Sequence, residues 1–134
     1  MPHARRSRRL VLVVDDDASL RGSIRALLES MGFLVSTASN ACEAVSEISA
    51  QRPDVILTDI YMPEGDGYEL IAAMRSFGEN IPIIAMSGGP ILVGVQDHLG
   101  MAERIGAVAT IAKPFRSAAL VETIDRAIGH CLAA

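Results

Sequence analysis

The sequence predicts an α/β fold in which a doubly wound, five-stranded parallel sheet carries helices on both faces, and two of its features support this. Five short runs of apolar, largely β-branched residues are typical of strands that are buried on both faces. Between these runs, apolar residues recur at the spacing of one helix face. Because crossovers between parallel strands are right-handed, this alternation places helices on both sides of the sheet.

The apolar runs give the expected strands in chain order: Leu10–Val14, Phe33–Ala38, Val55–Thr58, Ile83–Met86 and Val108–Ala112. The helical spacing predicts helices over Ala18–Met31, Ala41–Ala50, Tyr68–Phe77 and Ser117–Leu132, with one more ending near Gly106. Gly32 follows the first helix, as is usual at a helix end. Asn40 is a suitable N-cap for the second helix.

Length and charge predict one acidic domain behind a basic arm. The chain has 134 residues, which fits a single domain. Four of its 12 basic residues are arginines among the first nine positions, which leaves 8 basic against 16 acidic residues elsewhere. We expect a disordered basic arm at residues 1–8 and a folded domain at residues 9–134. The acidic body argues against nucleic-acid binding through its own field.

Cysteines and apolar runs bear on the compartment. Cys42 and Cys131 have neither disulfide-framework nor zinc-ligand spacing, which favours a reducing cytoplasm. The apolar run after the basic start is only five residues long, whereas a secretory signal needs about 7–15. No run approaches the roughly 18 apolar residues of a membrane helix. We expect a soluble cytoplasmic protein.

Polar side chains gather where the predicted strands end. They follow four of the five strands: Asp15, Asp16 and Asp17 the first, Asp59 the third, Ser87 the fourth and Lys113 the fifth. In open α/β sheets, ligands bind at the carboxyl ends of the strands. We therefore expect these groups to meet at one edge of the sheet.

This set of groups suits phosphoryl transfer to a carboxylate. Crowded carboxylates repel unless a cation joins them, and Mg²⁺ prefers oxygen ligands. A carboxylate beside bound Mg²⁺ can attack phosphorus and form an aspartyl-phosphate, a reaction that needs mainly positioning and neutralised charge. Ser87 offers a hydroxyl, and Lys113, the only lysine of the chain, offers a compact ammonium for phosphoryl oxygens.

Each of these residues also has a plainer interpretation. Acids are favourable at a helix N-terminus, and this is the interpretation that we prefer for Asp17. Asp59 could be a turn residue before Met62-Pro63, and Ser87 could open an ordinary Ser-Gly-Gly turn. Lys113 could be a solvated lysine. The shared edge of the sheet favours the functional interpretation of Asp15, Asp16, Asp59, Ser87 and Lys113.

Taken in order, the motifs resemble the response-regulator receiver family of two-component signalling. The similar segments are VVDDD at 13–17, DIYMPEGDG at 59–67, Ser87 and KPF at 113–115. The resemblance covers about residues 9–131. It implies a flavodoxin-like sheet with strand order 2-1-3-4-5.

The resemblance also implies roles for individual residues. Asp59 looks like the phosphoacceptor and one of the Mg²⁺ ligands. Asp16 looks like a direct Mg²⁺ ligand, Asp15 like a ligand acting through water, and the backbone carbonyl of Tyr61 like a further ligand. Ser87 and Lys113 look like the hydroxyl and ammonium groups that contact the phosphoryl oxygens.

Three positions depart from the family pattern. Thr110 stands where an aromatic switch residue is common, which puts an aromatic switch in doubt. Tyr61 is bulky, and we hypothesise that it slows attack by water on the phosphate. The segment between Ser87 and Gly106 is longer than usual and rich in glycine.

The resemblance implies a stand-alone bacterial response regulator that catalyses only its own phosphorylation and dephosphorylation. A sensor histidine kinase or a histidine phosphotransfer protein would donate the phosphoryl group, and an unknown downstream protein would receive the signal. No membrane partner is expected, and homodimer formation stays open. Two other functions also stay open: a phosphorylation-independent binding adaptor with a vestigial site, and a Mg²⁺-dependent phosphatase.

Overall fold

The predicted doubly wound sheet is present. A computed structural model describes residues 9–59, 72–73, 81–87, 108–112 and 115–133. Its elements run in the order β1 (Leu10–Val14), α2 (Ala18–Ser30), β2 (Leu34–Ala38), α3 (Ala41–Ala50), β3 (Val55–Asp59), β4 (Ile83–Ser87), β5 (Ala109–Ala112) and α6 (Ser117–Ala133). All strand pairs are parallel, and the strand order is β2-β1-β3-β4-β5, as the resemblance implied.

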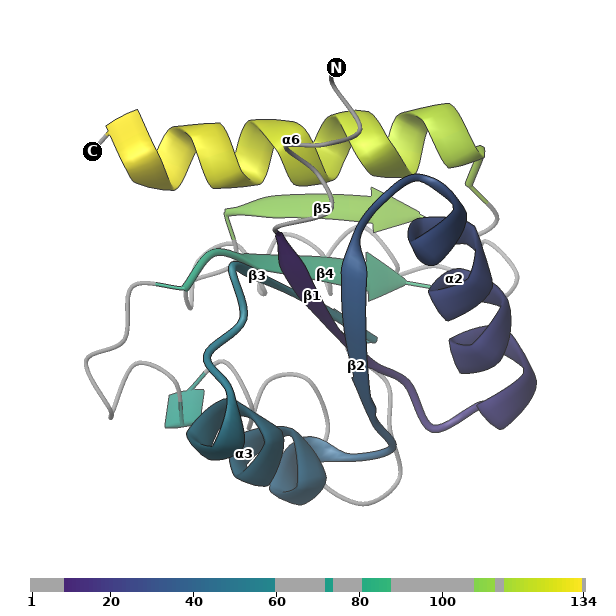
Figure 1. Cartoon of the computed structure of the whole chain (residues 1–134), viewed down its shortest axis with the longest axis vertical. Coiled ribbons are helices and arrows are strands. Elements are labelled where there is room, and N and C mark those ends of the chain that lie inside the picture. Colours follow the sequence, from purple (N-terminus) through teal and green to yellow (C-terminus); the bar gives the residue numbers. More distant parts are fainter. Residues whose placement is uncertain (1–8, 60–71, 74–80, 88–107, 113–114, 134) are drawn as a thin grey trace, which may run out of the picture.

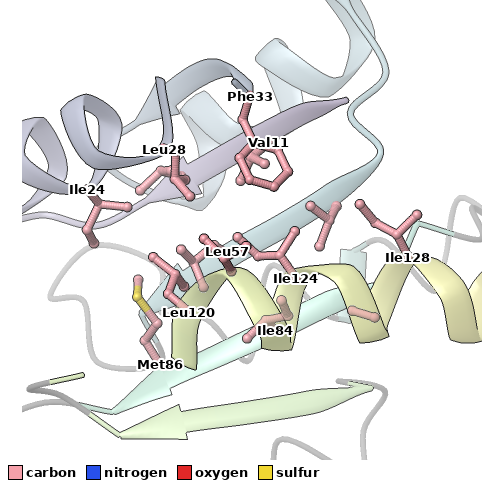
Figure 2. Packing of buried hydrophobic residues seen from close by; sticks show 14 residues of the cluster. Val11, Ile24, Leu28, Phe33, Leu57, Ile84, Met86, Leu120, Ile124 and Ile128 are labelled. Atoms are coloured by element: carbon pink, nitrogen blue, oxygen red, sulfur yellow. The ribbon is translucent and has the colours of Figure 1, made fainter. Parts of the chain in front are cut away.

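Successive side chains of each strand point to opposite sides of the sheet. Both faces of the sheet are therefore apolar, and helices cover both of them. Figure 1 shows α6 and α3 on opposite sides of the sheet. One core layer joins α3 to Leu12, Val14 and Ile56. The other joins α2 and α6 to the intervening strand positions, and Figure 2 shows Ile24 and Leu28 of α2 facing Leu57 and Ile124.

Several predicted strand boundaries were off by one residue. β3 extends to Asp59 and β4 to Ser87, because strand pairing continues through these polar residues. β5 begins at Ala109 rather than Val108, whose backbone amide nevertheless donates to the Ile83 carbonyl at 2.9 Å. The predicted helix Tyr68–Phe77 and the one ending near Gly106 fall largely outside the described residues, as does the basic arm.

Phe33 belongs to a helix cap and not to β2. The Gly32 amide donates to the Glu29 carbonyl at 3.1 Å, and the Phe33 amide donates to the Leu28 carbonyl at 3.0 Å. Gly32 itself has a φ of 97°. This is the Schellman arrangement, in which a hydrophobic contact usually joins the last residue of the cap to the helix. Phe33 and Leu28 lie in the same buried cluster (Figure 2).

Replacing Gly32 by Ala is expected to lower the free energy of unfolding by about 1–2 kcal/mol, because an L side chain is disfavoured at positive φ. Gly22, an exposed glycine inside α2 with open space where a Cβ would project, is the matched control. Gly22→Ala is expected to raise stability by about 0.5–1 kcal/mol, because Ala is the better helix former. Urea unfolding followed by circular dichroism measures both. Equal effects of the two substitutions would contradict the role of Gly32.

Asp54, which directly precedes β3, forms hydrogen bonds with the start of β1 at the amino end of the sheet. Its carboxylate accepts a hydrogen bond from the Leu10 amide at 2.7 Å, and its own amide donates to the Leu10 carbonyl at 2.8 Å. The Arg9 guanidinium lies 3.8 Å from the same carboxylate. These contacts join the start of β1 to the start of β3.

No helix in the described part of the chain is both long and apolar enough to cross a membrane.

Candidate functional site

Three carboxylates meet at the carboxyl edge of the sheet. One oxygen from each of Asp15, Asp16 and Asp59 lies within 4.8 Å of the others. The register explains the meeting: Val14 of β1 pairs with Thr58 of β3, so the next residue of each strand is an aspartate. Asp15 is fully buried and Asp59 is 7% exposed, whereas Asp16 is exposed. Two acids of the cluster are therefore buried, and the third faces solvent.

The turn after β1 holds Asp15 by both its backbone and its side chain. The Asp15 amide donates to the Ala38 carbonyl at 3.1 Å, which extends the pairing with β2. The Asp15 carboxylate accepts from the Asp17 amide at 2.9 Å. Asp17 in turn is the N-cap of α2, and its carboxylate accepts from the Leu20 amide at 3.1 Å. The prediction that Asp17 serves the helix N-terminus is confirmed.

Two residues that sequence reasoning missed also contact the backbone of the site. The guanidinium of Arg21, in the second turn of α2, donates to the Asp15 carbonyl at 2.7 Å. The hydroxyl of Thr58, fully buried in β3, donates to the Asp59 carbonyl at 3.0 Å. The signal for Thr58 in the sequence was a polar residue inside an otherwise apolar strand. Arg21 carried no comparable signal, because a cation early in a helix is ordinarily a solvated residue.

A family model for the response regulator receiver domain matches residues 11–125. The chain belongs to the receiver domain family of response regulators. It is 34% identical over 125 residues to an uncharacterized 14.6 kDa protein of Leptolyngbya boryana, covering 92% of this chain and 90% of that protein.

Longer proteins contain a similar segment. The C4-dicarboxylate transport transcriptional regulatory protein DctD of Rhizobium meliloti is 36% identical over 118 residues, which is 87% of this chain but 25% of DctD. Among solved structures, a response regulator receiver domain protein from Clostridium thermocellum has a TM-score of 0.82 at 27% identity and covers 91% of this chain and 95% of that one. The receiver fold is thus shared over almost the whole chain.

The other predicted site residues of this receiver domain are only partly described. Ser87 is the last residue of β4, and its backbone pairs with Ala112, the residue before Lys113. Because Asp59 pairs with Met86, the backbone of Ser87 lies one position beyond Asp59 at the same edge. The Ser87 side chain, Tyr61 and Lys113 lie outside the described parts of the chain, so their roles stay predictions. Thr110 is in β5.

A further acid, Glu43, lies outside the cluster. Glu43, in the first turn of α3, accepts a hydrogen bond from the Ser39 amide at 2.8 Å. This hydrogen bond from the Ser39 backbone lowers the pKa of Glu43. A hydrogen bond with the Ser39 side chain has a smaller effect in the same direction, as has the charge of Arg21.

The donor atoms of the cluster fit a hard divalent cation. All three groups offer carboxylate oxygens, the ligands that Mg²⁺ and Ca²⁺ prefer, and the described part of the cluster includes no histidine or cysteine. Three carboxylates so close together repel one another, and a cation would remove that repulsion. The geometry therefore supports a metal site formed by Asp15, Asp16 and Asp59.

Proposed function

We propose that this receiver domain accepts a phosphoryl group on Asp59, with Mg²⁺ held by Asp15, Asp16, Asp59 and the backbone carbonyl of Tyr61. The observation that carries the proposal is the cluster of three carboxylates within 4.8 Å at the carboxyl edge of a receiver sheet. When bound, Mg²⁺ supplies positive charge that offsets these acids and the phosphoryl oxygens. The likeness of residues 59–67 to the receiver family supports Asp59, the last residue of the central strand β3, as the acceptor.

The phosphoryl donor is a phosphohistidine of a sensor histidine kinase or of a histidine phosphotransfer protein. A carboxylate oxygen of Asp59 forms the new O–P bond while the N–P bond of the donor breaks, and the leaving imidazole nitrogen takes up a proton. The Thr58 hydroxyl holds the Asp59 carbonyl during this step. The Ser87 hydroxyl donates to a phosphoryl oxygen, and the Lys113 ammonium pairs with another. The chain catalyses only its own phosphorylation and dephosphorylation.

The output is a phosphorylation-dependent contact with another protein in the bacterial cytoplasm. The new phosphoryl oxygens offer Ser87 and Lys113 acceptors that the free carboxylate lacks. Such a difference in contacts between two states is what shifts a conformational equilibrium. The signal therefore passes to a downstream protein through the surface near β4 and β5.

The proposal is tested by the intact mass of the chain after incubation with a small-molecule acyl phosphate. With Mg²⁺ present, the chain is expected to gain one phosphoryl group, and with a chelator in its place the gain is expected to disappear. A chain that binds Mg²⁺ but gains no group, either from the acyl phosphate or from a phosphorylated histidine kinase, would instead favour the phosphorylation-independent adaptor. Sustained hydrolysis of a phosphomonoester would favour the phosphatase.

Replacing Asp16 by Asn is expected to change metal affinity and stability in opposite directions. Mg²⁺ affinity should fall by at least about tenfold, since losing even an outer partner of a metal ligand costs about 10–100-fold. The metal-free protein should become more stable by about 0.5–1 kcal/mol, because one of three neighbouring charges is removed. Calorimetric titration and urea unfolding measure the two effects.

Asp17→Asn is the matched control for this change. It removes the same charge one residue along the chain, outside the cluster, and Asn is as good an N-cap as Asp. Mg²⁺ affinity is expected to stay within about twofold of the wild-type value, an expectation that follows from screening of exposed charges. Equal losses in the two variants would mean that total charge, and not ligation by Asp16, governs binding.

A further inference from the structure

Arg21 contacts the turn that carries Asp16 from outside the carboxylate cluster. Its guanidinium donates to the Asp15 carbonyl at 2.7 Å, and the residue is half-buried. Its own amide donates to the Asp17 carbonyl at 2.9 Å, in the first turn of the helix. Arg21 therefore links the helix back to the turn by one backbone and one side-chain hydrogen bond.

The acceptor of the guanidinium is part of the peptide group between Asp15 and Asp16. Because a peptide group is planar, holding its oxygen also orients the Cα of Asp16. The following peptide group, between Asp16 and Asp17, is held by the bond from the Asp17 amide to the Asp15 carboxylate at 2.9 Å. Both peptide groups beside Asp16 are thus fixed, although its side chain is exposed.

We infer that Arg21 is a positioning residue for the proposed metal ligand Asp16. It orients the peptide group between Asp15 and Asp16, and so directs the Asp16 carboxylate toward those of Asp15 and Asp59. The inference rests on the proposed Mg²⁺ site. Arg21 places a second cation near that site, so its charge alone would weaken Mg²⁺ binding by repulsion. Its hydrogen bond strengthens binding by holding a ligand in place. The two effects have opposite signs, and binding measurements separate them.

The experiment is a calorimetric titration of the full chain with Mg²⁺ alone, without any phosphodonor. Arg21→Met keeps the aliphatic stem but removes the donors and the charge, and Arg21→Lys keeps the charge and one donor group. Arg25→Met is the matched control. Arg25 lies one turn further along α2, is about half exposed, and pairs with Glu29 at 3.4 Å, a partner outside the cluster.

Positioning by Arg21 predicts that Arg21→Met loses about tenfold in Mg²⁺ affinity, that Arg21→Lys lies between this variant and the wild type, and that Arg25→Met is unchanged. Hydrogen exchange of the Asp17 amide in the metal-free protein should also quicken in Arg21→Met, because the turn loosens. This second measurement does not depend on metal binding.

Three results would overturn the inference. Wild-type affinity in Arg21→Met, together with unchanged exchange of the Asp17 amide, would show that the hydrogen bond does not position Asp16, and tighter binding in Arg21→Met than in Arg21→Lys would show that the charge of Arg21 outweighs its hydrogen bond. Both results would leave the proposed function intact. A wild-type chain that binds no Mg²⁺ would overturn the proposed function and this inference with it.

Discussion

An Asp59→Asn chain is expected to gain no phosphoryl group under conditions in which the wild type gains one. An amide oxygen carries no negative charge and is a poor nucleophile toward phosphorus, so the loss should be complete. Asn has nearly the same shape as Asp, and the Thr58 hydroxyl bonds to the backbone carbonyl of residue 59, which the substitution leaves in place. The fold should therefore survive the change. Intact mass after incubation with an acyl phosphate and Mg²⁺ is the measurement.

Asp54→Asn is the control for this result. Asp54 precedes the opposite end of the same strand, and an Asn oxygen there can still accept the hydrogen bond from the Leu10 amide. This variant is expected to gain the phosphoryl group as the wild type does. If Asp59→Asn were still labelled to one equivalent, the acceptor would be another residue and the assignment of Asp59 would be wrong.

Leu28→Ala is expected to lower the free energy of unfolding by about 3–4 kcal/mol, within the range for buried leucines. Leu28 lies in α2, is fully buried, and belongs to one cluster with Phe33 and with Ile124 of α6 (Figure 2). The substitution removes apolar contacts within this cluster, including the hydrophobic contact with Phe33 in the Schellman cap. Such a loss is a large part of the roughly 5–15 kcal/mol that stabilises a typical domain.

Leu34→Ala makes the same chemical change at an exposed position. Leu34 is 50% exposed at the start of the edge strand β2, so its truncation should cost less than about 1 kcal/mol. Urea unfolding followed by circular dichroism measures both variants, since the chain has no tryptophan. Comparable losses in the two variants would contradict the assignment of Leu28 to the core.

The central strands β1, β3 and β4 could be predicted from the sequence because they are buried on both faces. The runs at Leu10–Val14 and Val55–Thr58 are wholly apolar or nearly so, a pattern that few other structures need. The boundaries were harder, because backbone pairing does not depend on side-chain polarity. Asp59 therefore continues β3, and Phe33, although apolar, ends a helix cap instead of beginning β2.

The acids of the site could be predicted because they directly follow strands whose carboxyl ends meet. Register then brings Asp15 and Asp59 together across β1 and β3. The contacts of Arg21 and Thr58 could not be predicted in the same way, because each residue donates to a backbone carbonyl. Thr58 at least stands out as a polar residue in an apolar strand, whereas Arg21 is ordinary for the start of a helix. The roles of Ser87, Lys113 and Tyr61 stay predictions.

The distance along the chain between the clustered acids makes the proposed metal site depend on folding. Asp15 and Asp16 are neighbours, but Asp59 reaches them only when β3 pairs with β1, so the unfolded chain lacks the complete set of ligands. A ligand that binds only the folded state adds about 2.7 kcal/mol to its stability at about one hundred times its dissociation constant. The midpoint of thermal unfolding should therefore rise with the concentration of Mg²⁺, and a melting curve becomes a titration of the site.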